Sequence, residues 1–255
     1  MKNILYEAIK DTHNKIFAER QPEFYGRIHF HRAFEIAYIA EGVTDFMVDD
    51  EKIHAEENDI IFVHSYGRHT ARDVCQNSKY VIAVSENFSK DVNNLFKEFT
   101  LPAYLGDKEF NKTLLPFFKV LEQKGEYMST MLARGYVNVV FGSLAEHYEK
   151  AAIKQKNKNI SVIADTLSYI DNHYKEQITL EDIANVFGYN KTYFSRLFNN
   201  HICMSLNNYI NMVRFDKFEE QYKISKNKNI TNLAMECGFS SLATFYRVKK
   251  FRNNN

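Results

Sequence analysis

The sequence is short of several residue types, and each shortage excludes a class of protein. It contains no tryptophan and only three cysteines, and Cys75, Cys203 and Cys237 are too scattered for a disulfide framework or for paired zinc ligands. No apolar run is long enough to cross a bilayer, and the charged N-terminal segment lacks the apolar core of a signal peptide. We therefore expect a soluble, cytoplasmic protein with no membrane partner. Without tryptophan, the 16 tyrosines and 21 phenylalanines are expected to supply core volume.

The formal net charge of +1 conceals an uneven distribution of charge along the chain. Residues 1–150 carry 18 basic and 23 acidic side chains, whereas residues 151–255 carry 15 basic and 9 acidic ones. A basic second half favours contact with nucleic acid at that end only, although a solvated lysine surface would give the same sum.

The hydrophobic pattern divides the chain into two parts. Short strand-like segments between turn signals occupy about residues 26–84, which is typical of a small barrel or sandwich. Helical periodicity follows over about 88–99, 108–124 and 127–149. A polar segment then leads into a wholly helical region. We predict an N-terminal domain over 1–150, a linker over 151–160 and a C-terminal domain over 161–255.

One pattern occurs twice near the end of the chain, fifty residues apart. In each copy, apolar residues at i, i+3, i+4 and i+7 form one buried helix face, and a glycine follows where the chain must turn sharply. A polar residue after each glycine, Asn190 or Ser240, is expected to cap a second helix. This is the outline of a helix-turn-helix, whose second helix can enter the major groove of DNA. The two copies are Leu180, Ile183, Ala184, Phe187, Gly188 and Ile230, Leu233, Ala234, Cys237, Gly238.

The second helix of each copy has an aromatic residue, expected to be buried, with an arginine two residues later: Phe194 with Arg196, and Phe245 with Arg247. Its outer face has short polar or basic side chains, which can hydrogen-bond base edges and phosphates. A helical hairpin that packs only for stability is the alternative interpretation. We predict that DNA is contacted by Lys191, Thr192, Ser195, Arg196 and Asn199 in the first copy, and by Ser241, Ala243, Thr244, Tyr246 and Arg247 in the second.

A wider set of residues, between 160 and 252, has the pattern of a known family. The segments are Thr179 to Ala184, Gly188-Tyr189, Tyr193 to Phe198, Tyr209-Ile210 with Arg214, and Ala234 to Phe239 with Phe245 to Arg247. Together they resemble the AraC-type transcription regulators. The resemblance implies an α+β two-domain fold: an N-terminal cupin-like β-barrel with accessory helices, and a C-terminal all-α domain of two helix-turn-helix units joined by a linking helix.

The same resemblance implies a function and a mechanism. We expect a sequence-specific regulator of transcription, an activator or a repressor, that binds double-stranded DNA and performs no catalysis. A small-molecule effector in the barrel would alter how a homodimer presents its DNA-binding domains, provided that the effector prefers one arrangement. The predicted helix over 127–148 is apolar on more than one face, so we expect it to form the dimer contact.

Three residues depart from the pattern of that family. Cys203 stands where glycine is usual, Phe218 where a small residue is usual, and Lys249 where a core phenylalanine is usual. The glycine-proline turn and closing helix of the family are also missing before Asn255. We therefore expect the second helix-turn-helix unit to be less stable than the first and to contribute less to specificity.

A different motif lies in the N-terminal half. The spacing of His29, His31, Glu35 and Gly42 resembles the first metal-binding motif of cupin barrels, and His69 falls where a later strand could add a ligand. Histidines at i and i+2 on a strand face the same way, so with a carboxylate they could hold a divalent metal. The second cupin motif, however, lacks its proline and glycine framework. We predict an effector pocket without a metal or other cofactor, lined by Arg27, His29, His31, Glu35, Tyr38 and His69.

Two other functions compete with this interpretation. A metal-dependent cupin enzyme would need a complete set of metal ligands in the barrel. A DNA-blind, truncated regulator would still dimerise and would act as a brake on a longer relative. Tightly bound metal that is lost on changing His31 would favour the enzyme, whereas a failure to select any DNA sequence would favour the truncated regulator.

Overall fold

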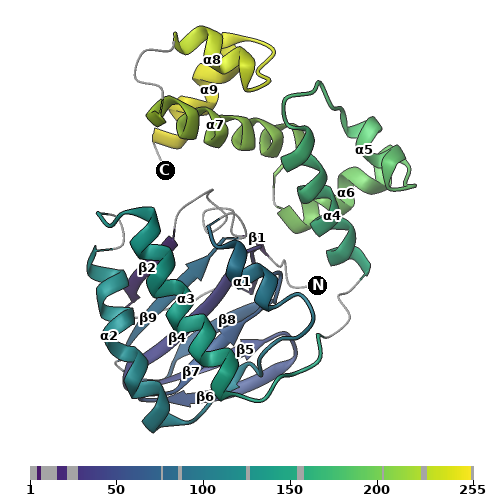
Figure 1. Cartoon of the computed structure of the whole chain (residues 1–255). Helices are drawn as coiled ribbons and strands as arrows, with labels where there is room; N and C mark the ends of the chain where they lie inside the picture. Colours follow the sequence, from purple (N-terminus) through teal and green to yellow (C-terminus); the bar gives the residue numbers. More distant parts are fainter. Residues whose placement is uncertain are drawn as a thin grey trace. The chain divides into compact units, whose positions relative to one another are not determined.

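The computed structural model describes residues 5–6, 16–21, 28–75, 77–85, 88–124, 127–153, 158–202, 204–224 and 229–253. The chain forms two compact units, Met1–Gln155 and Lys156–Asn255 (Figure 1). The first unit combines β-sheets with helices, and the second is helical. Within the ranges above, no helix combines the length and the apolar character needed to cross a membrane.

Two five-stranded sheets make up the core of the first unit. The first sheet has the order β1 (Leu5–Tyr6), β3 (His29–Phe30), β8 (His69–Asp73), β5 (Val43–Val48), β6 (Glu51–Glu56). The second has the order β10 (Tyr104–Leu105), β7 (Ile60–Val63), β4 (Phe34–Glu41), β9 (Ser78–Val84), β2 (Ile16–Gln21). The short strands predicted over about 26–84 are confirmed, since β3 to β9 lie between His29 and Val84. Gly42, Asp49 and Asn58, at turns between these strands, all have positive φ.

The prediction of a barrel is wrong in one respect. No ladder of hydrogen bonds joins the two sheets among the residues described, so they form a pair of sheets rather than a closed barrel. Instead, they share an apolar core built from alternate residues of both, such as Ala37 and Ile39 of β4 with Phe46 and Val48 of β5. Packing of two apolar faces takes the place of strand pairing in holding the sheets together.

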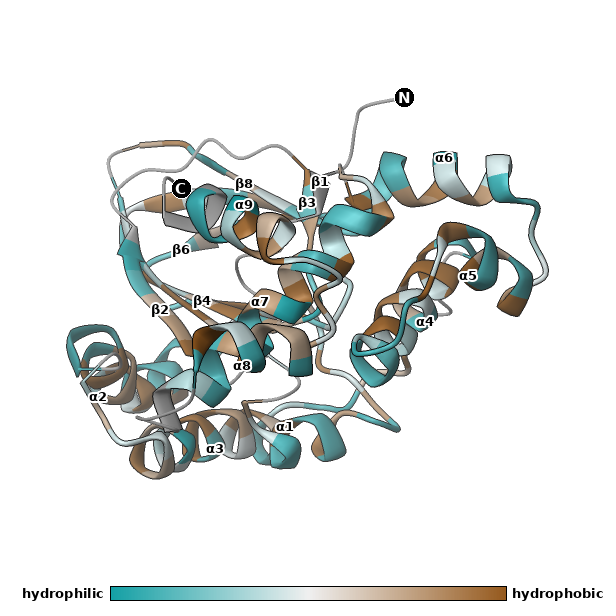
Figure 2. Ribbon diagram, turned by 90° about the horizontal axis from the view of Figure 1, so that it is seen from above, coloured by the Kyte–Doolittle hydropathy of each residue, from teal (hydrophilic) through white to brown (hydrophobic). Residues whose placement is uncertain are grey.

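Helices cover the other face of the second sheet, as Figure 1 shows. They are α1 (Lys90–Leu95), α2 (Lys108–Lys124) and α3 (Thr130–His147). The predicted helix over 108–124 is confirmed, whereas α1 and α3 begin later than predicted because Ser89 and Ser129 act as N-caps. Figure 2 shows hydrophobic and hydrophilic residues on each of α2 and α3, as expected for helices that pack on a sheet by one side.

Charged residues also enter the space between the sheets. Lys79 of β9 is 1% exposed, and its Nζ lies 2.9 Å from Asp73 Oδ1, which also accepts a hydrogen bond from Thr44. Glu35 is 5% exposed near the opposite end of β4. Buried charges require partners of opposite charge or hydrogen-bonding groups. A defined set of polar side chains therefore lies at each end of this core.

Six helices lie among the described residues of the second unit. They are α4 (Lys158–His173), α5 (Leu180–Val186), α6 (Lys191–Ile202), α7 (Leu206–Ile224), α8 (Ile230–Glu236) and α9 (Leu242–Asn253). Helix α4 begins at Lys158, inside the segment 151–160 that the composition indicated as a linker. The linking helix that the family resemblance implies is α7, which packs against α8 and α9 and also against α4 and α6.

The turns between the paired helices are set by glycines and caps. Gly188 and Gly238 have φ of 71° and 89°, in the left-handed region that glycine tolerates best. Asn190 caps α6 as predicted, because its side chain accepts a hydrogen bond from the Tyr193 amide at 2.8 Å. The prediction that Ser240 caps α9 is wrong: the second turn is one residue longer, and Ser241 Oγ accepts from the Thr244 amide at 3.3 Å.

The loop after α4 connects the two helix pairs. Arg214 of α7 donates from Nε to the Tyr174 carbonyl and from Nη2 to the Glu176 carbonyl, both at 2.7 Å. Gln177 donates to the carbonyl of Gly238 at 3.1 Å. A Cβ on Gly238 would lie 2.7 Å from the Tyr174 carbonyl oxygen, so this turn packs directly on the loop backbone.

Candidate functional site

The first group of candidate residues lies on α6. Phe194 is fully buried, and this fixes which side of the helix faces the core. Lys191, Thr192, Arg196 and Asn199 are exposed, and Ser195 is half-buried beside them. Lys191 lies 3.1 Å from Glu181 of α5, while no ion pair of the described residues includes Arg196. Helix α6 therefore presents a polar face with an arginine in its middle.

Helix α9 repeats this arrangement with different side chains. Phe245 is fully buried and contacts Phe218 edge to face at 4.7 Å between ring centroids. Ala243, Tyr246 and Arg247 are exposed, and Thr244 is half-buried. Ser241, predicted to contact DNA, is at the N-cap, where its Oγ lies 3.1 Å from Thr244 Oγ1. The bulky Phe218 thus fills the core of this helix pair rather than disrupting it.

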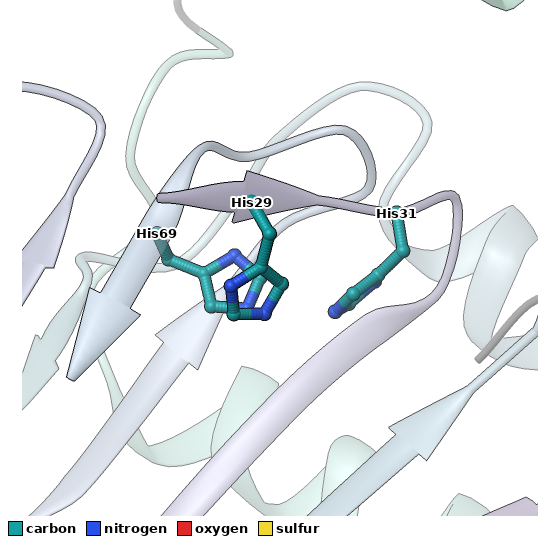
Figure 3. Close-up of side chains that lie close together, drawn as sticks. All are labelled: His29, His31 and His69. Atoms are coloured by element: carbon teal, nitrogen blue, oxygen red, sulfur yellow. The ribbon is translucent and has the colours of Figure 1, made fainter. Parts of the chain in front are cut away.

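Three histidines from two segments of the chain converge between the sheets of the first unit. His29 and His69 are directly paired across β3 and β8, and His31 follows β3. One potential ligand atom from each lies within 4.8 Å of the other two, and all three side chains are buried. Figure 3 shows the three rings directed toward the same space. This convergence was predicted from the spacing of the residues.

Glu35 completes the group from the second sheet. One of its carboxylate oxygens lies 3.1 Å from His31 Nε2, and the other lies 3.5 Å from His69 Nε2. Glu35 belongs to the face of β4 that points between the sheets, because its alternate neighbours Ala37 and Ile39 are in the inter-sheet core. We refer to His29, His31, Glu35 and His69 as the histidine cluster.

Two other predicted pocket residues are not placed in this cluster. Tyr38 lies on the opposite face of β4 from Glu35, because an odd separation of three residues reverses the side of a strand. It packs on Phe118 of α2 and donates a hydrogen bond to Asn58 at 2.6 Å. Arg27 lies outside the described residues.

Backbone groups that the sequence did not reveal hold the cluster in place. His31 Nδ1 lies 3.0 Å from the carbonyl of Ala33, and His69 Nδ1 lies 3.0 Å from that of Gly67. The amide of Tyr66, a non-glycine residue with φ of 64°, donates to the His31 carbonyl at 2.8 Å. A positive φ at a tyrosine has no reliable signal in the sequence, so this part of the site was missed.

Comparison with known protein families identifies both units. Residues 183–252 match the model of a helix-turn-helix domain, and residues 16–77 match that of an AraC-like ligand binding domain. The chain is an AraC-type transcription regulator. In this AraC-type regulator, residues 183–252 contain α6 and almost all of α9. Residues 16–77 contain the whole histidine cluster.

Several known proteins are similar to this AraC-type regulator. The HTH-type transcriptional regulator YdeC of Bacillus subtilis is 24% identical over 253 residues, which cover 88% of this chain and 81% of YdeC. The transposon Tn10 TetD protein of Escherichia coli is 34% identical over 91 residues, covering 36% of this chain and 65% of TetD. The crystal structure of ToxT from Vibrio cholerae is 15% identical, covers 92% of this chain and 93% of ToxT, and has a TM-score of 0.42.

Proposed function

We propose that this regulator binds double-stranded DNA sequence-specifically through the outer faces of α6 and α9. The pairs α5–α6 and α8–α9 act as two helix-turn-helix units joined by α7. The observation that carries the proposal is the repeated design of the second helix, which buries a phenylalanine and exposes an arginine two residues later. Arginine can bond two acceptors of guanine together, and the shorter side chains beside it leave room for close approach to bases.

We propose that the N-terminal unit senses a ligand and also forms a homodimer. The histidine cluster supports the first role, since it gathers polar groups inside the range that matches a ligand-binding domain. Helix α3 supports the second role, because it exposes Met131, Leu132 and Val139 while its other side packs in the core. An apolar stripe on one helix can be buried against the same stripe of a second copy.

The test is selection of bound duplexes from a random DNA library by the full chain at moderate salt, where non-specific phosphate binding is weak. We expect enrichment of a motif with two blocks about one helical turn apart, because two linked units would read successive major grooves. A single short block would show that only one unit reads sequence. No enriched motif would contradict the proposal and favour a DNA-blind protein.

Substitution of the arginines separates the contributions of the two units. Arg196→Ala is expected to weaken binding to the selected site by about 5- to 150-fold, equivalent to about 1–3 kcal/mol for a lost bidentate base contact. Arg247→Ala is expected to cost less, following the predicted ranking of the units. Lys175→Ala, an exposed cation of the same unit outside both helices, is the control and should have little effect. Equal losses from both arginine variants, measured by fluorescence anisotropy, would show that the ranking is wrong.

A further inference from the structure

We infer that the histidine cluster binds one divalent transition-metal ion between the two sheets of the N-terminal unit. This inference rests on the proposed ligand-sensing role of that site and specifies its ligand as a metal ion. It is independent of DNA binding by α6 and α9. The metal ligands are the imidazoles of His29, His31 and His69, with the carboxylate of Glu35 beside them.

The positions of the donor atoms carry the first step. One nitrogen of each histidine lies within 4.8 Å of the others. Two donors with metal bonds of about 2.1 Å lie roughly 3–4 Å apart, so the rings need to close by only about 1 Å. The Glu35 oxygen at 3.1 Å from His31 Nε2 is already at the separation of two ligands on one metal. The site is thus nearly formed by the fold alone.

The second step concerns protons. The carbonyls of Ala33 and Gly67 can only accept, so the hydrogen-bond network assigns a proton to Nδ1 of both His31 and His69. Each Nε2 points at an oxygen of the Glu35 carboxylate, at 3.1 Å from His31 and 3.5 Å from His69. A metal ion at Nε2 would take the place of the proton in this contact, and the released proton would pass to solvent, while Nδ1 keeps its N–H.

The third step is the support of the ligands. Metal-bound histidines commonly donate their other ring N–H to a carbonyl or carboxylate, which orients the ring and makes it a better ligand. Both Nδ1 contacts have this form. The loop that leads into His69 is held by two hydrogen bonds: Asp49 accepts from the Arg68 amide at 3.1 Å, and the Tyr66 amide donates to the His31 carbonyl. Such support keeps the donor atoms in position before an ion arrives.

The donor set also selects the class of metal. Three imidazoles and one carboxylate suit ions such as Zn²⁺, Co²⁺, Fe²⁺, Mn²⁺ or Ni²⁺. Mg²⁺ and Ca²⁺ prefer oxygen ligands, and this site has only one oxygen-bearing side chain within the cluster. The cluster is buried, so a bound ion would be held inside the unit rather than on its surface.

The experiment uses the full chain, stripped of metal with a chelator and dialysed. Titration with Zn²⁺ by calorimetry should show one saturable site with micromolar or tighter affinity. Titration with Co²⁺ should produce the visible absorption bands of a cobalt ion with nitrogen ligands. His31→Gln and His69→Gln should each weaken binding at least about tenfold, since even changes to groups behind metal ligands cost 10- to 100-fold. His54→Gln is the control, because that imidazole is in the same unit but is exposed and paired with Asp45.

The results of this experiment can be distinguished from a loss of folding and from a failure of the DNA-binding proposal. Circular dichroism and a thermal melt identify any variant that does not fold, and Glu35→Gln provides a further variant with nearly unchanged shape. The absence of a saturable site in the wild-type chain would overturn the inference, and so would Zn²⁺ binding that His31→Gln and His69→Gln leave intact. Neither result would affect the DNA selection, which reports on the C-terminal unit alone.

Discussion

At the scale of single residues, the face of a strand decides what a buried polar side chain does. Glu35 and Tyr38 are close in sequence and both are buried, but they lie on opposite faces of β4. Glu35 meets histidines between the sheets, whereas Tyr38 meets α2 and the amide side chain of Asn58. The first residue belongs to the candidate ligand site and the second to the contact between the sheet and its helices.

Because of Tyr38, the N-terminal unit is expected to lose stability at alkaline pH. Burial, with a contribution from the negative charge of Glu57, raises the pKa of Tyr38 to about 12. A pKa raised above the unfolded value of about 10 means that the neutral form stabilises the fold below pH 10. We expect this stabilisation to be lost as the pH rises from about 10 to about 12. Denaturant unfolding across this window measures it.

Tyr38→Phe should reduce that pH dependence, because phenylalanine cannot ionise. At neutral pH it should cost only about 1 kcal/mol, the value of the hydrogen bond to Asn58. Tyr127→Phe, at an exposed position, serves as the control and should leave the alkaline profile unchanged. A Tyr38→Phe profile that coincides with that of the wild type would rule out this origin.

The residues of the histidine cluster were largely predictable, whereas their supporting contacts were not. Spacing of i and i+2 places His29 and His31 on one side of the chain, and the motif then adds Glu35. Tyr38 is three positions after Glu35 in β4, so its side chain points to the helices instead of into the predicted pocket. The carbonyls of Ala33 and Gly67 are backbone groups present in every residue, so no pattern of side chains could identify them.

At the scale of elements, two glycines occupy equivalent turns but differ in their surroundings. Gly188 has no heavy atom within 4 Å of its ideal Cβ position, whereas at Gly238 that position lies 2.8 Å from the Cα of Lys175. Both have positive φ, so alanine at either position is strained by about 1–2 kcal/mol. Only Gly238→Ala also forces two segments of backbone apart.

We therefore expect Gly238→Ala to destabilise the C-terminal unit more than Gly188→Ala does. The clash adds about 1–3 kcal/mol to the conformational strain. Each variant is the control for the other, because both replace glycine by alanine at a position with positive φ. Denaturant unfolding of both, compared with the wild type, measures the difference. Equal losses of stability would mean that the loop of residues 174–177 can move away from the added methyl group without destabilising the unit.

Helices were easier to predict than the turns between them. The apolar period identified α2, α5 and α8, because each buries one face in a core. Thr179 and Asp182 form a capping box at the start of α5. The extra residue before α9 was missed because Ser240 and Ser241 are adjacent and chemically alike, so composition does not decide which of them caps.

At the scale of the whole molecule, the two units differ in how far apart in sequence their contacting elements are. The N-terminal unit depends on contacts between strands that are distant in sequence, as in the pairing of β2 with β9. The helical unit uses short connections instead. A barrel was expected because many short strands fit either a barrel or a sandwich, and only the pairing of edge strands distinguishes the two.

The proposed dimer leads to a prediction about α3. Met131 is 86% exposed, so Met131→Glu should leave the monomer folded. In a dimer it would bury an unpaired carboxylate, and we expect the dissociation constant to rise at least about tenfold. Gln123→Glu, exposed on α2, adds the same charge and is the control. Analytical ultracentrifugation measures the change, and an unaltered monomer–dimer equilibrium would exclude Met131 from the contact.

The loop of residues 174–177 belongs to neither helix pair alone. Arg214 holds two of its carbonyls, and the turn before α9 lies against its backbone. Unfolding of either pair would remove packing and hydrogen bonds from the other, so the C-terminal unit should melt in a single cooperative transition. It follows that the pairs α5–α6 and α8–α9, although they repeat one pattern, are not modules that fold or can be exchanged separately.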